Sequence, residues 1–185
     1  MSAKKLRLFV STPMPVEVQQ AIALFQKKIK KEKLCDGIFT NPNQAHITLK
    51  FLGPIDASKL SDIEKSLQTI TFKKQKAQLG RVRWFDTGGK IDLLFFSVIC
   101  PALEELEKLV VEVLQPWVPK ETRMFVNHTT LMRVNEVHNS MRFLRFIEGY
   151  QVEPIEFMID SFALMESKTD AEDAEHTVLK TYGLK

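Results

Sequence analysis

Two stretches of this sequence share the motif His-x-Thr-Leu, and they decide its fold: Ala45-His46-Ile47-Thr48-Leu49-Lys50-Phe51-Leu52-Gly53 and Phe125-Val126-Asn127-His128-Thr129-Thr130-Leu131-Met132-Arg133. Both contain His-x-Thr-Leu among apolar residues, a pattern typical of a half-buried strand. Side chains alternate along a strand, so each histidine shares a face with the threonine two residues later. In the first stretch Lys50 falls on that same face, whereas Phe51 is expected on the opposite, core-facing side.

Apolar periodicity and turn residues predict the same order of elements before each motif. A strand over residues 6–12 and a helix from about Pro15 precede the first motif. A buried strand over 91–99 and a helix from Pro101 precede the second, since proline suits a first helical turn. Gly53-Pro54 is expected to end the first motif strand. The other expected elements are helices following Asp56 and over 140–148, and strands over 45–52, 70–85, 123–134, 155–166 and 175–182.

The two halves are also alike in their residues. Leu8-Phe9-Val10-Ser11 resembles Leu94-Phe95-Phe96-Ser97 at an offset of 86, and the two motif histidines lie 82 residues apart. A repeated order of elements with repeated motifs indicates an internal duplication. We therefore expect a single domain over residues 1–185 with an α+β, bilobal, duplicated fold, its pseudo-repeat lobes at about 1–85 and 86–185. Two antiparallel sheets would line a central cleft, with helices packed on the outside.

The composition is that of an ordinary globular protein. Of the 185 residues, 44% are hydrophobic and 26% are charged, and a net charge of +3 permits an anionic substrate without indicating a protein that coats nucleic acid. The lysine-rich run at residues 27–31 is interpreted as the solvated face of a helix. Cys35 and Cys100 show no metal-ligand or redox spacing. No apolar run suits a signal peptide or a membrane span, so we expect a cytoplasmic monomer without a membrane partner.

The two motifs together supply two imidazoles and two hydroxyls, a set suited to cleaving a phosphodiester. Histidine titrates near neutral pH, so one imidazole can take a proton from the attacking oxygen while the other gives one to the leaving oxygen. Threonine hydroxyls can donate hydrogen bonds to the non-bridging oxygens, where negative charge develops. No His, Cys, Asp and Glu cluster has metal-ligand spacing, so we expect neither a metal nor another cofactor.

The first stretch resembles the first signature of the two-histidine (2H) phosphoesterases, and residues 125–133 resemble the second. The likeness is greatest to bacterial and archaeal RNA 2′,3′-cyclic phosphodiesterases, also called 2′-5′ RNA ligases. Arg7-Leu8-Phe9-Val10 and residues 162–167 are similar too, so the resemblance spans nearly the whole chain. The family implies a bilobal α+β fold and hydrolysis of an RNA 2′,3′-cyclic phosphate end to a 2′-phosphate, with the 3′-oxygen leaving. The reverse reaction would be a weak 2′-5′ ligation.

The resemblance also implies a role for each motif residue. His46 would donate the proton to the leaving oxygen, and His128 would be the base that activates water. Thr48 and Thr130 would hold the phosphate. Arg133 matches a position that the family often fills with arginine, and it would add positive charge. Strict alternation points Arg133 away from His128, so it reaches the phosphate only if the strand bulges or ends first.

The sequence departs from the family pattern at three places. Asn127 stands where proline is usual and Thr129 where isoleucine or valine is usual. The closing pattern usually carries a tyrosine where this chain has His176-Thr177-Val178-Leu179. These departures leave the substrate preference open. His138 is expected to be exposed, and no partner for His176 is visible in the sequence. Trp84 is interpreted as a half-buried strand residue rather than a platform for a base.

Several functions remain open on the sequence alone. The leading hypothesis is a metal-independent RNA 2′,3′-cyclic phosphodiesterase. A second keeps the active site but acts on a small cyclic nucleotide, a 2′-5′ oligonucleotide or an ADP-ribose cyclic phosphate. A third is a non-catalytic nucleotide- or RNA-binding module, against which the presence of both histidines and both threonines argues. A metal-dependent hydrolase is the fourth, and it would lose activity in a chelator.

Overall fold

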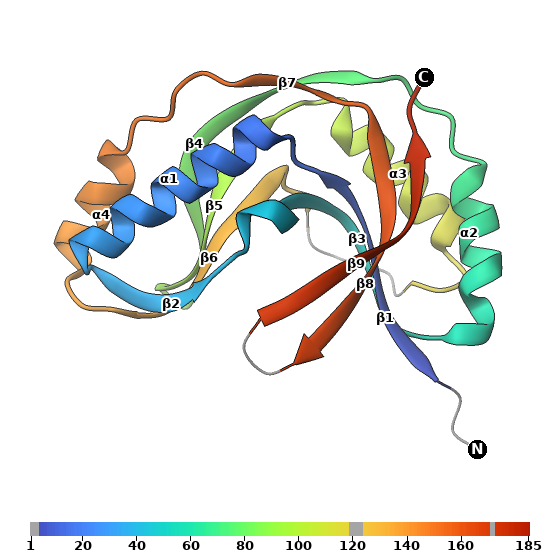
Figure 1. The fold of residues 1–185 in the computed structure, drawn as a ribbon, viewed down its shortest axis with the longest axis horizontal. Helices are drawn as coiled ribbons and strands as arrows, with labels where there is room; N and C mark the ends of the chain where they lie inside the picture. Colours follow the sequence, from blue (N-terminus) through green and yellow to red (C-terminus); the bar gives the residue numbers. More distant parts are fainter. Residues whose placement is uncertain (1–3, 119–123, 171–172) are drawn as a thin grey trace.

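The computed structural model describes residues 4–118, 124–170 and 173–185, which form two antiparallel sheets and four α-helices (Figure 1). Sheet A has the order β3-β1-β8-β9, and sheet B has the order β2-β6-β5-β4-β7. The predicted α+β fold with two antiparallel sheets is confirmed. The strands are β1 (Lys5–Pro13), β2 (Cys35–Phe39), β3 (His46–Asp56), β4 (Gln75–Thr87), β5 (Lys90–Ile99), β6 (His128–Val137), β7 (Glu156–Ile159), β8 (Ser161–Asp170) and β9 (Asp173–Gly183). The helices are α1 (Val16–Glu32), α2 (Leu60–Gln68), α3 (Leu103–Leu114) and α4 (Ser140–Gly149).

Two predicted boundaries are wrong for local reasons. Strand β3 does not stop at Gly53-Pro54 but runs on to Asp56. Gly53 adopts a φ of 75°, which a residue without a Cβ takes at little cost, and Pro54 still pairs with Arg7 of β1. The second motif strand begins at His128 rather than 123, a residue that lies outside the described ranges.

Two other differences come from sheet pairing. The single strand expected over 155–166 is divided between β7 in sheet B and β8 in sheet A. Strand β2, which the sequence analysis did not predict, pairs with β6 at the edge of sheet B. Both are short or divided segments whose strand conformation depends on a partner far away in the sequence, so local patterns carry little signal for them.

Each sheet combines strands from both halves of the sequence. In sheet A, β1 lies between β3 and β8; in sheet B, β5 lies between β6 and β4. Strands β1 and β5 thus each pair with the motif strand of their own half on one side. On the other side each pairs with a strand from the other half. This arrangement ties the two sheets together by chain crossings rather than by a single linker.

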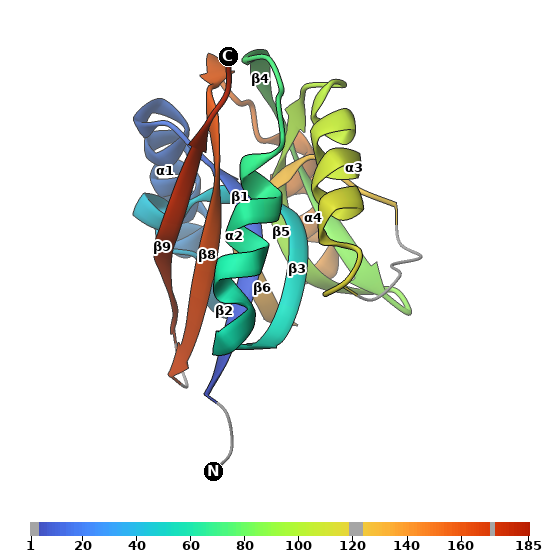
Figure 2. The same cartoon turned by 90° about the vertical axis from the view of Figure 1, so that its right-hand side faces the viewer.

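The four helices cover one face of each sheet. Helices α1 and α4 lie over sheet B, and α2 lies across sheet A beside α3 (Figures 1 and 2). On α1 the predicted apolar face is confirmed, since Val18, Ile22, Phe25 and Ile29 are each at most 2% exposed. Their spacing of four, three and four residues keeps them on one side of the helix. Complete burial of each side chain stabilises the fold by about 1.5–3 kcal/mol.

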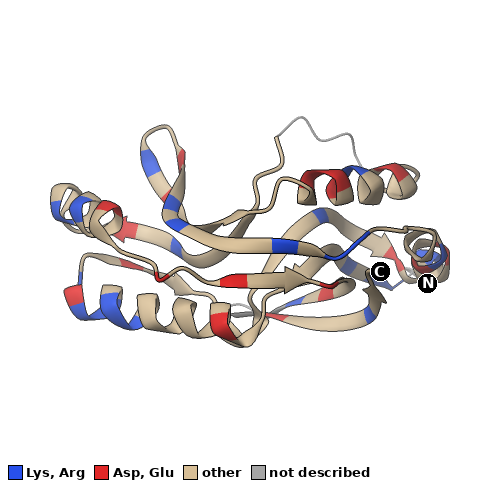
Figure 3. Cartoon of the chain, turned by 90° about the horizontal axis from the view of Figure 1, so that it is seen from above, with Lys and Arg blue, Asp and Glu red and all other residues tan. Residues whose placement is uncertain are grey.

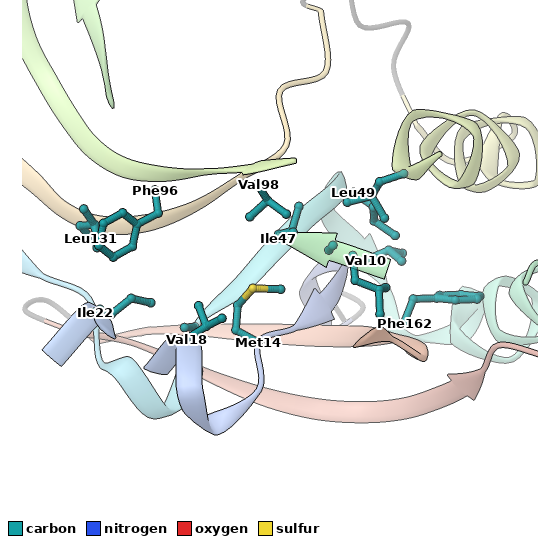
Figure 4. Packing of buried hydrophobic residues seen from close by; sticks show 14 of the residues in the cluster. Val10, Met14, Val18, Ile22, Ile47, Leu49, Phe96, Val98, Leu131 and Phe162 are labelled. Carbon is teal, nitrogen blue, oxygen red and sulfur yellow. The ribbon is translucent and has the colours of Figure 1, made fainter. Parts of the chain in front are cut away.

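The buried side chains form one core cluster that continues from sheet A to sheet B. Ile47 of β3 lies near Val98 of β5 and Met14, while Val10 and Phe162 continue the cluster beneath sheet A (Figure 4). The alternate residues of the motif strands point to the other side of each sheet, away from the helices. We call that side the histidine face, because it carries His46 on sheet A and His128 on sheet B.

The lysine-rich run lies at the C-terminal end of α1 (Figure 3), and its four lysines are exposed, as predicted for a solvated face. Two of them contact aromatic rings of the same chain: the Lys30 ammonium lies 4.2 Å from the Phe39 ring centroid, and that of Lys28 lies 5.0 Å from Tyr150. Such cation–π contacts stabilise an exposed site by about 0.5–1 kcal/mol each. Within the described residues, none of the helices combines the length and apolar character needed to cross a membrane.

Candidate active site

His46 is the first residue of β3, and its ring is fixed from two sides. Its Nδ1 lies 2.7 Å from the Gln44 carbonyl oxygen, and its ring centroid lies 5.1 Å from that of Phe9 on β1. A carbonyl oxygen only accepts hydrogen bonds, so Nδ1 donates and carries the hydrogen. The neutral imidazole therefore keeps its basic nitrogen, Nε2, free for a substrate.

His128 is held in the same way on sheet B. Its Nδ1 donates to the Val126 carbonyl oxygen at 2.7 Å, and its ring centroid lies 5.1 Å from that of Phe95 on β5. Phe9 and Phe95 are the equivalent residues in the offset of 86, but the sequence analysis assigned neither a role. Both phenylalanines are nearly buried, at 2% and 3% exposure, so each forms a rigid support beneath an imidazole.

The surroundings of both imidazoles disfavour a positive charge. Burial lowers the pKa of His46 from 6.5 to about 4; the bond to the Gln44 carbonyl opposes this shift, and the charges of His176 and His128 add to it. Burial also lowers the pKa of His128, and its bond to the Val126 carbonyl again opposes the shift. In the substrate-free protein both imidazoles are therefore neutral at pH 7.

Thr48 and Thr130 lie on the histidine faces, two residues after their histidines. Both are partly exposed, whereas Ile47 and Thr129 beside them are fully buried. Thr130 pairs with Phe95, the residue that supports His128. Each sheet thus presents an imidazole and a hydroxyl on one side. The positions are those expected from strand alternation.

Alternation fails directly after each threonine, because both motif strands contain a bulge. In β3 the register passes from Thr48 to Lys50 and skips Leu49; in β6 it passes from Thr130 to Met132 and skips Leu131. An extra residue reverses the faces of the residues that directly follow it, up to the next bulge.

The bulge in β3 makes two predictions wrong. Lys50 does not share the face of His46; it is turned to the other side of the sheet and is only 3% exposed. Phe51, expected in the core, instead lies on the histidine face with 62% of its surface exposed. Its ring centroid lies 5.9 Å from that of Phe9, so an exposed aromatic ring lies beside the His46 site.

The bulge in β6 has the same effect on Arg133. Leu131 and Met132 are both fully buried, and Arg133 is exposed. It pairs with Leu93, which lies two residues from Phe95 and therefore on the same face of β5. Arg133 thus shares the histidine face with His128 and Thr130. Phe51 and Arg133 occupy equivalent positions, five residues after the two histidines.

His176 is the neighbour that sequence reasoning missed. Its ring centroid lies 5.3 Å from that of His46 and 5.0 Å from that of Phe9. Its backbone N–H donates to the Gln44 side-chain oxygen at 3.4 Å, and its buried Nδ1 has no hydrogen-bond partner among the described residues. The one signal in the sequence was that His176 begins the stretch His176-Thr177-Val178-Leu179, which departs from the family's closing pattern.

The other singled-out residues have structural surroundings. The Asn127 side-chain N–H donates to the Cys100 carbonyl oxygen at 2.9 Å, beside the buried Cys100 thiol. Trp84 is half-buried against the core, as predicted. His138 is exposed, as predicted, and its Nε2 lies 3.0 Å from an Asp36 carboxylate oxygen. Among the residues that the structure describes, no three His, Cys, Asp or Glu side chains gather closely enough to hold a metal ion.

Comparisons with known proteins point in one direction. Residues 12–90, which include the first motif, match the family model described as LigT like phosphoesterase. A curated RNA 2′,3′-cyclic phosphodiesterase from Methanocaldococcus jannaschii is 29% identical over 149 residues, which cover 79% of this chain and 82% of that protein.

Solved structures share the fold over almost the whole length. The protein TT0787 of Thermus thermophilus aligns over 96% of this chain and 97% of its own, with a TM-score of 0.78 at 21% identity. Escherichia coli LigT complexed with 3′-AMP aligns over 97% of this chain and 98% of its own, with a TM-score of 0.76 at 19% identity. The first half of the chain is thus similar to the LigT-like phosphoesterases, the curated relative extends a sequence likeness over most of the chain, and the solved structures share its fold.

Proposed function

We propose that this protein hydrolyses 2′,3′-cyclic phosphate ends of RNA to 2′-phosphates, using His46 and His128 without a metal ion. The observation that carries the proposal is the matched pair of motif strands. In each, the histidine Nδ1 donates a hydrogen bond of 2.7 Å to a backbone carbonyl oxygen, which leaves Nε2 free. A threonine hydroxyl lies on the same face. The named activity of the Methanocaldococcus jannaschii relative supports the choice of RNA ends.

The reaction needs one base and one acid on opposite sides of the phosphorus. The Nε2 atom of His128 takes a proton from water, and the water oxygen bonds to phosphorus. The bond from phosphorus to the 3′-oxygen breaks, and that oxygen takes a proton from Nε2 of His46. Thr48 and Thr130 donate hydrogen bonds to the non-bridging oxygens as their charge grows. The division between acid and base follows the resemblance to the family.

Substrate binding supplies the charge state that His46 needs as an acid. With a pKa of about 4 its imidazole is neutral in the free protein at pH 7. A bound phosphate anion next to Nε2 favours the protonated form and raises that pKa. Arg133 adds a fixed positive charge on the side of His128, where it helps to hold the anion rather than to protonate it. Run in reverse, the same steps join a cyclic phosphate to a 5′-hydroxyl, a weak 2′-5′ ligation.

A small cyclic nucleotide is the second candidate substrate, and one observation favours it. The solved Escherichia coli LigT with 3′-AMP contains a mononucleotide. The chemistry would be unchanged, since the same cyclic phosphate reacts. A cytoplasmic site of action, expected because no apolar run in the sequence suits a signal peptide or a membrane span, belongs to either version of the proposal.

The test is an assay in EDTA on an oligoribonucleotide that ends in a 2′,3′-cyclic phosphate. We expect the wild type to form a 2′-phosphate, and His46→Ala and His128→Ala each to lower kcat by about 10²–10⁴-fold, the usual contribution of a general acid or base. His138→Ala is the matched control, because this exposed histidine pairs with Asp36 outside the site. Full turnover by either motif variant, or loss of activity in EDTA, would contradict the proposal.

A further inference from the structure

Three residues of β4 continue the histidine face of sheet B beyond the motif strand. In the register of the sheet, Arg83 pairs with Phe95, and Phe95 pairs with Thr130. Residues that pair across strands point to the same side. Strands lie about 4.8 Å apart, so the Arg83 Cα lies roughly 10 Å from that of Thr130. Arg83 is therefore two strands away from the hydroxyl that would hold the phosphate.

Phe85 connects this part of β4 to His128. Its ring centroid lies 5.2 Å from that of His128 and 4.5 Å from that of Phe95, and 38% of its surface is exposed. Because Phe85 is two residues from Arg83, the two side chains share a face. The imidazole of His128, the ring of Phe85 and the side chain of Arg83 therefore lie on one face of the sheet.

Arg81 lies in a bulge of β4, directly before Val82, and continues the line of residues formed by Phe85 and Arg83. The register advances three residues in β4, from Leu79 to Val82, against two in β5, from Val98 to Phe96. Leu79 and Val82 are buried, while Arg81 between them is exposed. The hydroxyl of Ser97, which pairs with His128, donates to the Arg81 carbonyl oxygen at 3.2 Å.

Both guanidinium groups are available to an anion. Arg81 and Arg83 are exposed, and neither forms an ion pair with the carboxylates of the described residues. Past Gln78, β4 no longer pairs with β7, so both arginines lie on a free sheet edge. A cavity of about 350 Å³ adjoins this edge, lined by Arg81, Val82, Arg83, Trp84, Ile147 and Glu148. This cavity lies on the helix side of the edge, since Val82 and Trp84 face the core and Ile147 and Glu148 come from α4. Its positive charges come from the two arginines of the strand.

In the corresponding strand of sheet A, the described residues that face the histidine side carry no such charges. There β8 takes the place that β4 has in sheet B, and the partner of Phe9 is Met165, where the partner of Phe95 is Arg83. The next β8 residue on that face is Ala163, which pairs with Ser11. The two sheets are alike in their histidines and threonines, but among the described residues it is β4 of sheet B, and not β8 of sheet A, that adds two arginines on this face.

We propose that Arg81 and Arg83 bind the backbone of the RNA strand that precedes the cyclic end, so that the strand leaves the site across β4. This inference rests on the proposed function and deepens it, because it makes an RNA end rather than a mononucleotide the preferred substrate. The chain of an RNA continues from the 5′-oxygen of its last nucleotide. Each further nucleotide in that direction adds one phosphate, and each phosphate carries one negative charge. A nucleoside 2′,3′-cyclic phosphate lacks them.

The experiment compares two substrates with two matched pairs of substitutions. The substrates are uridine 2′,3′-cyclic phosphate and a hexaribonucleotide ending in the same group. The test variant is Arg81→Ala/Arg83→Ala, and the control is Arg142→Ala/Arg145→Ala, which removes the same charge from exposed positions on α4. We expect the test variant to lose about tenfold or more in kcat/KM on the hexamer and less than twofold on the mononucleotide. We expect the control to be unchanged on both.

Salt dependence and binding complete the test. Two phosphate contacts on a single strand contribute about 1.4 to the slope of log affinity against log salt, so the test variant should lose about that much of the wild-type slope. Equal losses on both substrates, or no loss on the hexamer, overturn the inference. If the wild type hydrolyses neither substrate, the proposed function has failed. Fluorescence anisotropy with the labelled hexamer then decides the inference: it stands if only the β4 variant binds more weakly, and it falls otherwise.

Discussion

The imidazole of His46 is subject to two opposing influences. Its burial disfavours a charge, while the hydrogen bond from Nδ1 to the Gln44 carbonyl favours one, and burial is the larger effect. His176, whose ring centroid lies 5.3 Å from that of His46, also lowers the pKa of His46 by charge repulsion. The site therefore holds a histidine that gives up its proton readily. A bound anion beside Nε2 favours the protonated imidazole and raises this pKa again.

The lowered pKa of His46 makes the stability of the protein depend on pH. Between pH 6.5 and 4 the unfolded chain binds a proton at this residue that the folded chain does not. The stabilisation is thus fully present above pH 6.5 and is lost as the pH falls toward 4. We expect it to amount to at most about 3 kcal/mol. Urea unfolding of the wild type and His46→Gln at pH 7 and pH 4.5 measures it. Equal losses in both proteins on acidification would contradict the assignment.

The position of a site residue could be predicted from the sequence where local strand geometry determines it, and could not where long-range strand pairing does. The histidines and threonines lie where strand alternation puts them, because a strand face is a local property. His176 could not be placed in this way. It reaches His46 through the pairing of β9 with β8 and of β8 with β1, and its distance from Gln44 along the chain is 132 residues.

At the scale of elements, most helices and strands follow from the sequence, and the bulges do not. The helices have amphipathic patterns that predict them, and the motif strands have apolar faces. Whether a strand skips a residue is decided by the register with its neighbour, here β1 for β3 and β5 for β6. The faces of Lys50, Phe51 and Arg133 follow from that register, so alternation alone was wrong for the first two and left the third open.

The pairing of β2 with β6 places a glycine directly against the bulged strand. A Cβ on Gly37 would collide with the Arg133 carbonyl oxygen and come within 2.8 Å of the Met132 Cε. We expect Gly37→Ala to lower the free energy of unfolding by about 1–3 kcal/mol, the usual effect of overpacking. The same change should weaken catalysis, since Arg133 must shift.

Chemical denaturation and kcat/KM on a cyclic phosphate measure the two effects of Gly37→Ala. Gly149→Ala is the control, because a Cβ there meets no atom within 4 Å and its backbone needs no positive φ. The control should stay within about 0.5 kcal/mol of the wild type. A Gly37→Ala protein as stable as this control would show that β2 can move away from β6 at little cost.

On the scale of the whole molecule, the expected pseudo-repeat lobes share their sheets. Strand β4 of the first half pairs with β5 of the second, and β8 of the second pairs with β1 of the first. One buried cluster runs beneath both sheets. Removing either half would leave an unpaired sheet edge in the other, so we propose that the two lobes form a single cooperative unit.

Calorimetry tests that unit directly. We expect one thermal transition, with equal calorimetric and van't Hoff enthalpies, as for a two-state domain of this size. Ile47→Ala, at the position between the two sheets, should lower the midpoint while the transition stays single. A core truncation of this kind costs about 2–5 kcal/mol. Two resolved transitions in the wild type, or a separation of them in the variant, would mean that the lobes fold independently.

The extra residue in each motif strand has a consequence for mutation. Positions 50 and 51 are adjacent in the sequence, yet Lys50 is 3% exposed and Phe51 is 62% exposed. A polar substitution that is tolerated at the exposed position 51 would be placed in the core at position 50. The same contrast holds between the buried Met132 and the exposed Arg133. Substrate preference can therefore change through a substitution at position 51 or 133 alone. The neighbouring positions 50 and 132 are buried, so core packing restricts which residues they can hold.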